Sequence, residues 1–159
     1  MQINLKVLGL MMGLALLGAC ADKDTAASTG SGAVATTGGV TAGSQEDLVA
    51  NVGDRVFFVL NSNTLSADAR TTLDRQAAWM ARFPAVSVQL AGNCDERGTT
   101  EFNLALGQRR SNSARDYLVA RGVSSARIVT TSNGKERPTA LGSDEQAYAQ
   151  NRNSTTSVR

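Results

Sequence analysis

Apolar and polar positions follow the periods of strands and helices only from about residue 46 onward. Residues 55–60 (RVFFVL) form a short β-branched and aromatic run, and residues 86–91 alternate between apolar and polar, so both ranges predict strands. Ser66 is a suitable N-cap for a helix between them, and Pro84 ends that helix. Four apolar residues recur in it at helical spacing: Ala69, Leu73, Ala77 and Met80.

The pattern of helices and strands continues to residue 158. A second helix is predicted over residues 100–120 and is closed by Gly122. Residues 127–131 predict a third strand, 144–150 a short helix, and 154–158 a last strand. This order predicts an α/β (α+β) two-layer sandwich, in which helices pack on one face of a small mixed sheet and a short C-terminal helix and strand follow.

A different pattern fills the N-terminal part. Residues 7–17 are an apolar and glycine run of eleven residues that follows Lys6. A membrane-spanning helix needs about 20 such residues, so the run predicts the core of a secretory signal over residues 1–19. It stops at Leu-Gly-Ala-Cys, which resembles the bacterial lipoprotein box, so Cys20 is the predicted lipidation site. An ordinary signal peptide, cut near this point with Cys20 incidental, is the alternative.

Residues 21–45 consist mainly of Ala, Ser, Thr and Gly. Such a segment buries too little apolar area to offset its conformational entropy, so residues 20–45 are predicted to be a lipidated cysteine and a flexible linker, with a domain over 46–159. Lipoproteins that stay in the inner membrane commonly carry aspartate after the cysteine. Ala21 at this position therefore predicts an outer-membrane anchor with the domain facing the periplasm.

Composition excludes several classes of function. The 159 residues carry a formal charge of +2 and no histidine. Without a basic stripe there is no reason to expect nucleic acid as a partner, and no spacing of ligands suggests a metal or another cofactor. A hydrolase would need Cys94 as its nucleophile, but no histidine exists to activate it, so we expect no enzyme. A disulfide between Cys20 and Cys94 is a further alternative.

One charged residue interrupts an apolar stripe. Leu106, Ala114 and Leu118 share a face of the second predicted helix with Arg110. A buried arginine keeps its charge and needs a carboxylate partner or an anionic ligand. The preceding loop offers Asp95. Taken alone, these residues favour a structural Asp95–Arg110 ion pair over an anion-binding site.

The surrounding motif changes this balance. Residues 92–110 (GNCDERGTTEFNLALGQRR), with TLSADAR at 64–70, NGKERPTALGSDE at 133–145 and Asn151-Arg152, resemble the OmpA-like peptidoglycan-binding domain family. The resemblance implies non-covalent binding of the meso-diaminopimelate in the peptidoglycan stem peptide. Asp95 would take the ammonium of that residue and Arg110 its carboxylate. The other ligand-binding residues implied are Leu106 and Phe58.

Some positions depart from the family pattern. Val59 and Asn61 replace two acids, so we expect weakened affinity for peptidoglycan. Thr155 and Ser157 stand where valines are usual, so we expect the last strand to pack poorly. Lipid-anchored members of the family also bind TolB and other Tol proteins, which maintain envelope integrity during cell division. A module that acts mainly through such a protein partner is therefore the alternative function.

Overall fold

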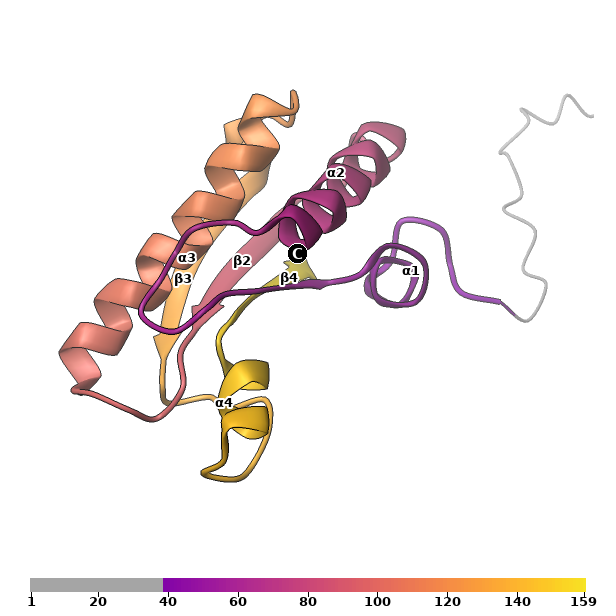
Figure 1. Ribbon diagram of the computed structural model, residues 1–159. Helices are drawn as coiled ribbons and strands as arrows, with labels where there is room; N and C mark the ends of the chain where they lie inside the picture. Colours follow the sequence, from indigo (N-terminus) through magenta and orange to yellow (C-terminus); the bar gives the residue numbers. More distant parts are fainter. Residues whose placement is uncertain (1–38) are drawn as a thin grey trace, which may run out of the picture. The chain divides into compact units, whose positions relative to one another are not determined.

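The computed structural model of the protein describes residues 39–159, and the predicted signal peptide, Cys20 and residues 21–38 of the predicted linker lie outside it. Figure 1 shows the arrangement of the described part. The elements follow in the order α1 (Gln45–Asp47), a π-helical turn (Leu48–Val52), β1 (Arg55–Phe57), α2 (Ala67–Arg82), β2 (Val88–Asn93), α3 (Thr100–Ala120), a 3-10 turn (Ser125–Arg127), β3 (Ile128–Gly134), α4 (Glu145–Asn151) and β4 (Asn153–Val158).

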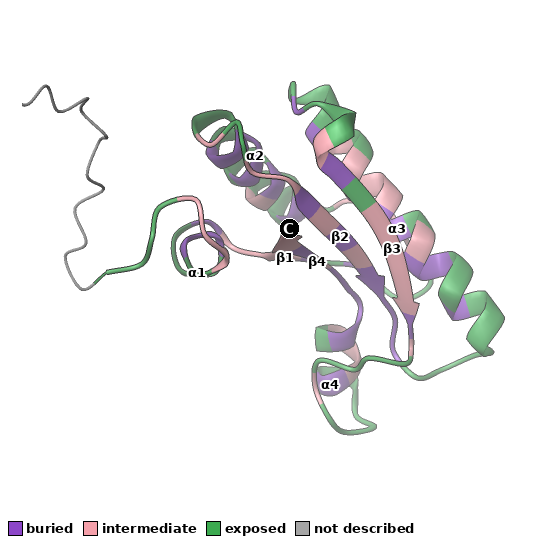
Figure 2. Cartoon of the chain, turned by 180° about the vertical axis from the view of Figure 1, so that it is seen from behind, coloured by how far each residue is buried: buried purple, intermediate pink, exposed green. Residues whose placement is uncertain are grey.

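The four strands form one mixed sheet in the spatial order β1-β4-β2-β3. β2 and β3 are parallel, whereas β4 is antiparallel to both of its neighbours, β1 and β2. Helices α2 and α3 lie in front of the strands in Figure 1, and the strands are nearer the viewer from behind in Figure 2. The predicted α/β architecture, with helices packed against a small mixed sheet, is confirmed.

The last strand is central, and the expectation that it packs poorly is wrong. Thr155 is in register with Ala91 and Ser157 with Gln89, two half-buried residues of β2. Residues directly opposite in an antiparallel pair share a face, so Thr155 and Ser157 lie on the face of the sheet that α2 and α3 leave uncovered. Their polarity therefore suits partial contact with water and does not disturb the core.

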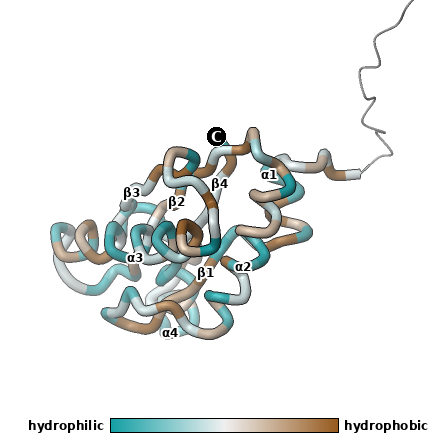
Figure 3. The backbone as a smooth tube through the Cα atoms, turned by 90° about the horizontal axis from the view of Figure 1, so that it is seen from above, coloured by the Kyte–Doolittle hydropathy of each residue, from teal (hydrophilic) through white to brown (hydrophobic). Residues whose placement is uncertain are grey.

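The core lies between the helices and the covered face of the sheet. Hydrophobic and hydrophilic residues alternate along α2 and α3, as Figure 3 shows, and the buried side chains on them meet Val88 and Leu90 of β2. The segment before β1 lies in the predicted domain, although no helix or strand was predicted there, and it adds Leu48 and Val52 to this core. Buried Asp47 accepts a 2.8 Å hydrogen bond from Trp79 Nε1 of α2.

Helix boundaries agree well with the sequence reading. α3 spans the predicted residues, the Ser66 side chain caps α2 by accepting from Ala69 N, and Gly122 after α3 has a left-handed φ of 93°. Strand ends agree less well, because β1 stops at Phe57 rather than at residue 60. In the segment after β1, the carbonyls of Val59 and Ser62 accept hydrogen bonds from the side chain of Arg110 and are not available to a strand ladder.

Two glycines bring α3 very close to the sheet. A Cβ atom added at Gly92 of β2 would meet the backbone of Gly107, and one added at Gly107 would lie 2.7 Å from the Gly92 carbonyl oxygen. Only glycine allows two backbones to approach this closely. This contact places Arg110, one turn further along α3, beneath the loop that follows β2.

Among residues 39–159, no helix is both long and apolar enough to cross a membrane.

Candidate ligand-binding site

Arg110 is held by backbone carbonyls and not by a carboxylate. Its side chain is buried, with 1% exposed, and its guanidinium donates from Nε to Ser62 O (2.8 Å), from Nη1 to Asn93 O (2.8 Å) and from Nη2 to Val59 O (3.2 Å). None of the ion pairs within residues 39–159 includes it. The structural Asp95–Arg110 ion pair favoured by the isolated residues is therefore wrong.

The environment of this guanidinium is apolar on one side. It lies over the Phe58 ring, with 5.2 Å between Cζ and the ring centroid. Burial lowers the pKa of Arg110. Carbonyl dipoles solvate the charge but do not neutralise it. Arg110 therefore remains a buried cation whose charge is not balanced by an anion among residues 39–159.

Asp95 lies in the loop after β2 and is paired with two other arginines. Its Oδ2 contacts Arg97 Nη2 at 2.6 Å and Arg152 Nη1 at 3.3 Å, and its Oδ1 accepts from the backbone N and from Nε of Arg97. Burial acts to raise the pKa of the Asp95 carboxyl, but the hydrogen bonds from Arg97 and Arg152 outweigh it and leave the pKa below its usual value. Asp95 is thus a fixed carboxylate.

Arg152 was not predicted as a site residue. The sequence analysis named it only as part of the Asn151-Arg152 match to the family. In the structure it is buried, donates to Phe58 O at 3.2 Å, and forms ion pairs with both Asp95 and Glu145. It therefore ties the start of β4, the loop after β1 and the loop after β2 together. No local pattern marks it, because its partners are 7, 57 and 94 residues away in the sequence.

These groups surround one small pocket, called here the Arg110 pocket. It is lined by Leu60, Asn61, Cys94, Asp95, Asn103, Leu106, Arg110 and Arg152. Three of the four predicted ligand-binding residues, Asp95, Leu106 and Arg110, are brought together there. The fourth, Phe58, supports the guanidinium from below and does not line the pocket.

Of the two departures from the family pattern, only Asn61 lines the Arg110 pocket. The side chain of Val59 is mostly exposed, at 68%, and only its carbonyl contacts Arg110. Asn61 lines the pocket and has a left-handed φ of 52°, a conformation that asparagine tolerates better than most residues.

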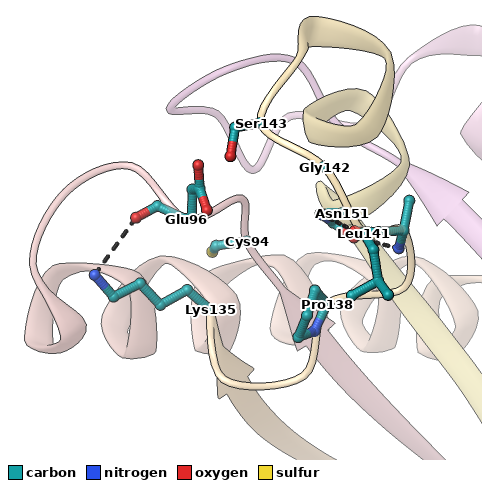
Figure 4. Close-up of a pocket in the computed structure, with 9 residues that line it drawn as sticks. Cys94, Glu96, Lys135, Pro138, Leu141, Gly142, Ser143 and Asn151 are labelled. Carbon is teal, nitrogen blue, oxygen red and sulfur yellow. Dashed lines mark hydrogen bonds between the residues drawn. The ribbon is translucent and has the colours of Figure 1, made fainter.

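A second cavity lies beside the first, with Cys94 in the wall of both; it is called here the Cys94 cavity. Figure 4 shows it between the loop after β2 and the loop that leads to α4, with Lys135 Nζ donating to Glu96 O at 3.4 Å. Its lining residues are Cys94, Glu96, Lys135, Pro138, Ala140, Leu141, Gly142, Ser143 and Asn151.

Cys94 lacks the properties of a nucleophile. Its thiol has no disulfide partner among residues 39–159; it is buried, lies 3.4 Å from Asn103 O, and has a pKa that burial raises above the usual value. A neutral buried thiol without a base is unreactive. Among residues 39–159, no cluster of cysteine, aspartate or glutamate could hold a metal ion.

Comparison with known proteins defines the class first. The model of the OmpA family matches residues 57–152, and the chain belongs to this family. The C-terminal domain of Helicobacter pylori MotB shares the fold, with a TM-score of 0.63 at 18% identity, covering 67% of this chain and 84% of that domain.

Within the family, the chain groups with the peptidoglycan-associated lipoproteins. It is 47% identical over 153 residues to the peptidoglycan-associated lipoprotein of Rhizobium meliloti (96% of this chain, 86% of the relative). It is 39% identical over 142 residues to that of Haemophilus influenzae (87% and 88%). The crystal structure of the Burkholderia pseudomallei protein matches with a TM-score of 0.65 at 38% identity (67% and 90%). This family is non-enzymatic.

Proposed function

We propose that the protein binds the meso-diaminopimelate stem peptide of peptidoglycan through the Arg110 pocket and leaves the peptidoglycan chemically unchanged. The observation that carries the proposal is the buried guanidinium of Arg110, which forms no ion pair with any carboxylate of residues 39–159, beside the fixed carboxylate of Asp95 in one pocket. The names of the relatives, which are peptidoglycan-associated lipoproteins, support it.

Diaminopimelate matches this pair of charges. The free end of its side chain carries an ammonium and a carboxylate on a single carbon. Arg110 Nη2 makes one hydrogen bond, to Val59 O, and has a second N–H to offer the carboxylate, while Asp95 attracts the ammonium. Lysine at the same position lacks the carboxylate and would leave Arg110 unpaired, so the site should reject lysine-type stem peptides.

A lipid on Cys20 would complete the function. It would hold the protein in the outer membrane, and residues 21–40 would let the domain reach the cell wall from the periplasmic side. The protein would thereby tether the outer membrane to peptidoglycan and support envelope integrity.

Co-sedimentation with purified sacculi tests the proposal. The full chain, extracted in mild detergent, should sediment with sacculi of the diaminopimelate type but not of the lysine type. Arg110→Ala should lose at least about tenfold in affinity, since a buried charge-assisted contact is worth roughly 1.5–3 kcal/mol. Arg109→Ala is the matched control, because Arg109 is the exposed neighbour on the same helix.

Arg110→Ala also removes the donors to three carbonyls, so a melting curve must show that the variant is folded. Val59→Asp avoids this difficulty, because the Val59 side chain is exposed. It restores an acid at a position where the family commonly has one, and it should tighten binding. Intact folding of all variants with no sedimentation of any would contradict the proposal.

A second candidate function is binding of a protein partner of the TolB type. The observation that favours it is an apolar groove beside β1, where Phe57 and Val59 are 43% and 68% exposed. The groove is lined by Phe57, Phe58, Val59, Thr64, Leu65, Ser66, Ala149 and Gln150. Co-elution with purified TolB that Phe57→Ser abolishes and Arg110→Ala preserves would support it, and co-elution that neither variant affects would place the contact elsewhere.

A further inference from the structure

Asp95 has no free acceptor position in this structure. A carboxylate offers about four lone-pair directions, and four donors already occupy them: the backbone N, Nε and Nη2 of Arg97 and Nη1 of Arg152. An ammonium that approaches Asp95 must therefore remove one of these donors.

The two arginines are not equally easy to remove. Arg152 is buried, with a side chain 9% exposed, and it also binds Phe58 O and Glu145. The Arg97 side chain is 38% exposed and covers Asp95 from the solvent side. It also has contacts that do not depend on Asp95, since its guanidinium lies 4.4 Å from the centre of the Tyr148 ring and its Nη1 lies 3.5 Å from Glu145 Oε2.

From these contacts we infer that Arg97 is an internal competitor, which occupies in the free protein the position on Asp95 that the ammonium of the ligand takes. This inference rests on the proposed function and deepens it. When the ligand binds, the Arg97 guanidinium leaves Asp95 and stays on α4, against Tyr148 and Glu145. The net charge of the cluster supports the exchange, because three arginines (97, 110 and 152) face only two carboxylates, Asp95 and Glu145.

The competitor makes the site more selective. A ligand that brings only an ammonium exchanges one cation for another at Asp95 and gains little. A ligand that brings a carboxylate to Arg110 in the same step gains a new charge-assisted contact, which offsets the loss of the Arg97–Asp95 pair. Discrimination between diaminopimelate and lysine therefore depends on Arg97 as well as on Arg110.

Titration calorimetry with soluble disaccharide-tripeptides tests this inference on the full chain in mild detergent. Arg97→Ala should bind the diaminopimelate-type peptide about fivefold more tightly, the factor that a partly exposed ion pair is typically worth. It should also acquire measurable affinity for the lysine-type peptide, so the ratio between the two affinities should fall. Arg97→Lys, which keeps the charge without the planar fork, should lie between Arg97→Ala and the wild type.

Arg109→Ala removes the same charge from an exposed position of α3 and should change neither affinity. Weaker or unchanged binding by Arg97→Ala would overturn the competitor role while leaving wall binding intact. An absence of binding by both the wild type and Arg97→Ala would refute the proposed function, and the competitor role with it.

Discussion

Individual residues in the Arg110 pocket carry charge in two different ways. Arg110 is solvated by the carbonyls of Val59, Ser62 and Asn93, so its charge is accommodated but not cancelled. Asp95 is neutralised by arginines that the loop and β4 bring to it. Because electrostatic interactions are stronger where water is excluded, the uncancelled cation is the group from which an anionic ligand gains most.

Acid should weaken the fold through Asp95. Its pKa in the folded protein lies below the usual value of 3.8, so the stability that its contacts contribute is present above about pH 4 and is lost as the pH falls through the folded pKa. Asp95→Asn lacks this contribution. In urea unfolding at pH 6 and pH 3, the free energy of unfolding of Asp95→Asn should therefore fall less than that of the wild type.

Part of the acid sensitivity should remain in that variant. The pKa of Asp47 is also lowered, chiefly by the backbone hydrogen bond from Gly43 and then by the Trp79 side chain. In the same assay, Asp47→Asn should lack the contribution that this second, distant carboxylate makes to the pH dependence of stability. An identical pH dependence in wild type and Asp95→Asn would mean that Arg97 and Arg152 do not stabilise the Asp95 carboxylate.

Among the elements, β4 determines how the sheet is completed. It is the last strand in the sequence but lies between β1 and β2, so the strand and the loops at its start are held from both sides. Its inward side chain Thr156 donates to Gln76 Oε1 of α2 at 2.9 Å, and both residues are buried. A polar contact therefore fastens this strand to the helix layer.

Two neighbouring positions of β4 should differ in how much a substitution to valine lowers stability. Thr156→Val leaves Gln76 Oε1 buried without its donor and should lower the free energy of unfolding by about 1–3 kcal/mol. Ser157→Val lies on the uncovered face, where a β-branched residue suits a strand, and should change stability by less than about 0.5 kcal/mol. Urea unfolding of both variants measures the difference, and equal losses would contradict the assignment of the two faces.

At the scale of the whole described part, residues before β1 are integral to the fold. Leu48 is fully buried, Val52 is 6% exposed, and Asp47 binds the only tryptophan of the chain, Trp79. Gln45 Oε1 also accepts a 2.7 Å hydrogen bond from the backbone N of Val158 at the opposite end of the chain. The N-terminal segment thus closes the core over α2 and β4.

Removal of this segment should have a large effect. A chain that lacks residues 1–52 loses burial of Leu48 and Val52, each worth roughly 1.5–3 kcal/mol, and its Trp79 emission should shift to the red as water reaches the indole. A chain that lacks only residues 1–40 should unfold at the same urea concentration as the full chain. Equal stability of the two truncated chains would show that residues 41–52 contribute nothing to the core.

Much of the fold could be predicted from local pattern. The period of apolar residues, the Ser66 cap, and Gly122 after the second long helix each reflect interactions within a few residues, so both long helices were predicted with nearly correct bounds. The motif around residues 92–110 indicated the family, and with it Asp95, Leu106 and Arg110, which the structure places in one pocket.

Tertiary structure alone decided how those residues are paired. The contacts of Arg110 with Val59 and Ser62, and of Asp95 with Arg152, join residues about 50 positions apart, and no local period encodes such distances. The same holds for β4. Its polar residues led us to expect poor packing, but the register of the strand places Thr155 and Ser157 on the uncovered face. Sequence determined which side chains and elements exist, because these depend on neighbours along the chain. Folding determined which charges meet and which faces are covered, because these depend on contacts between distant segments.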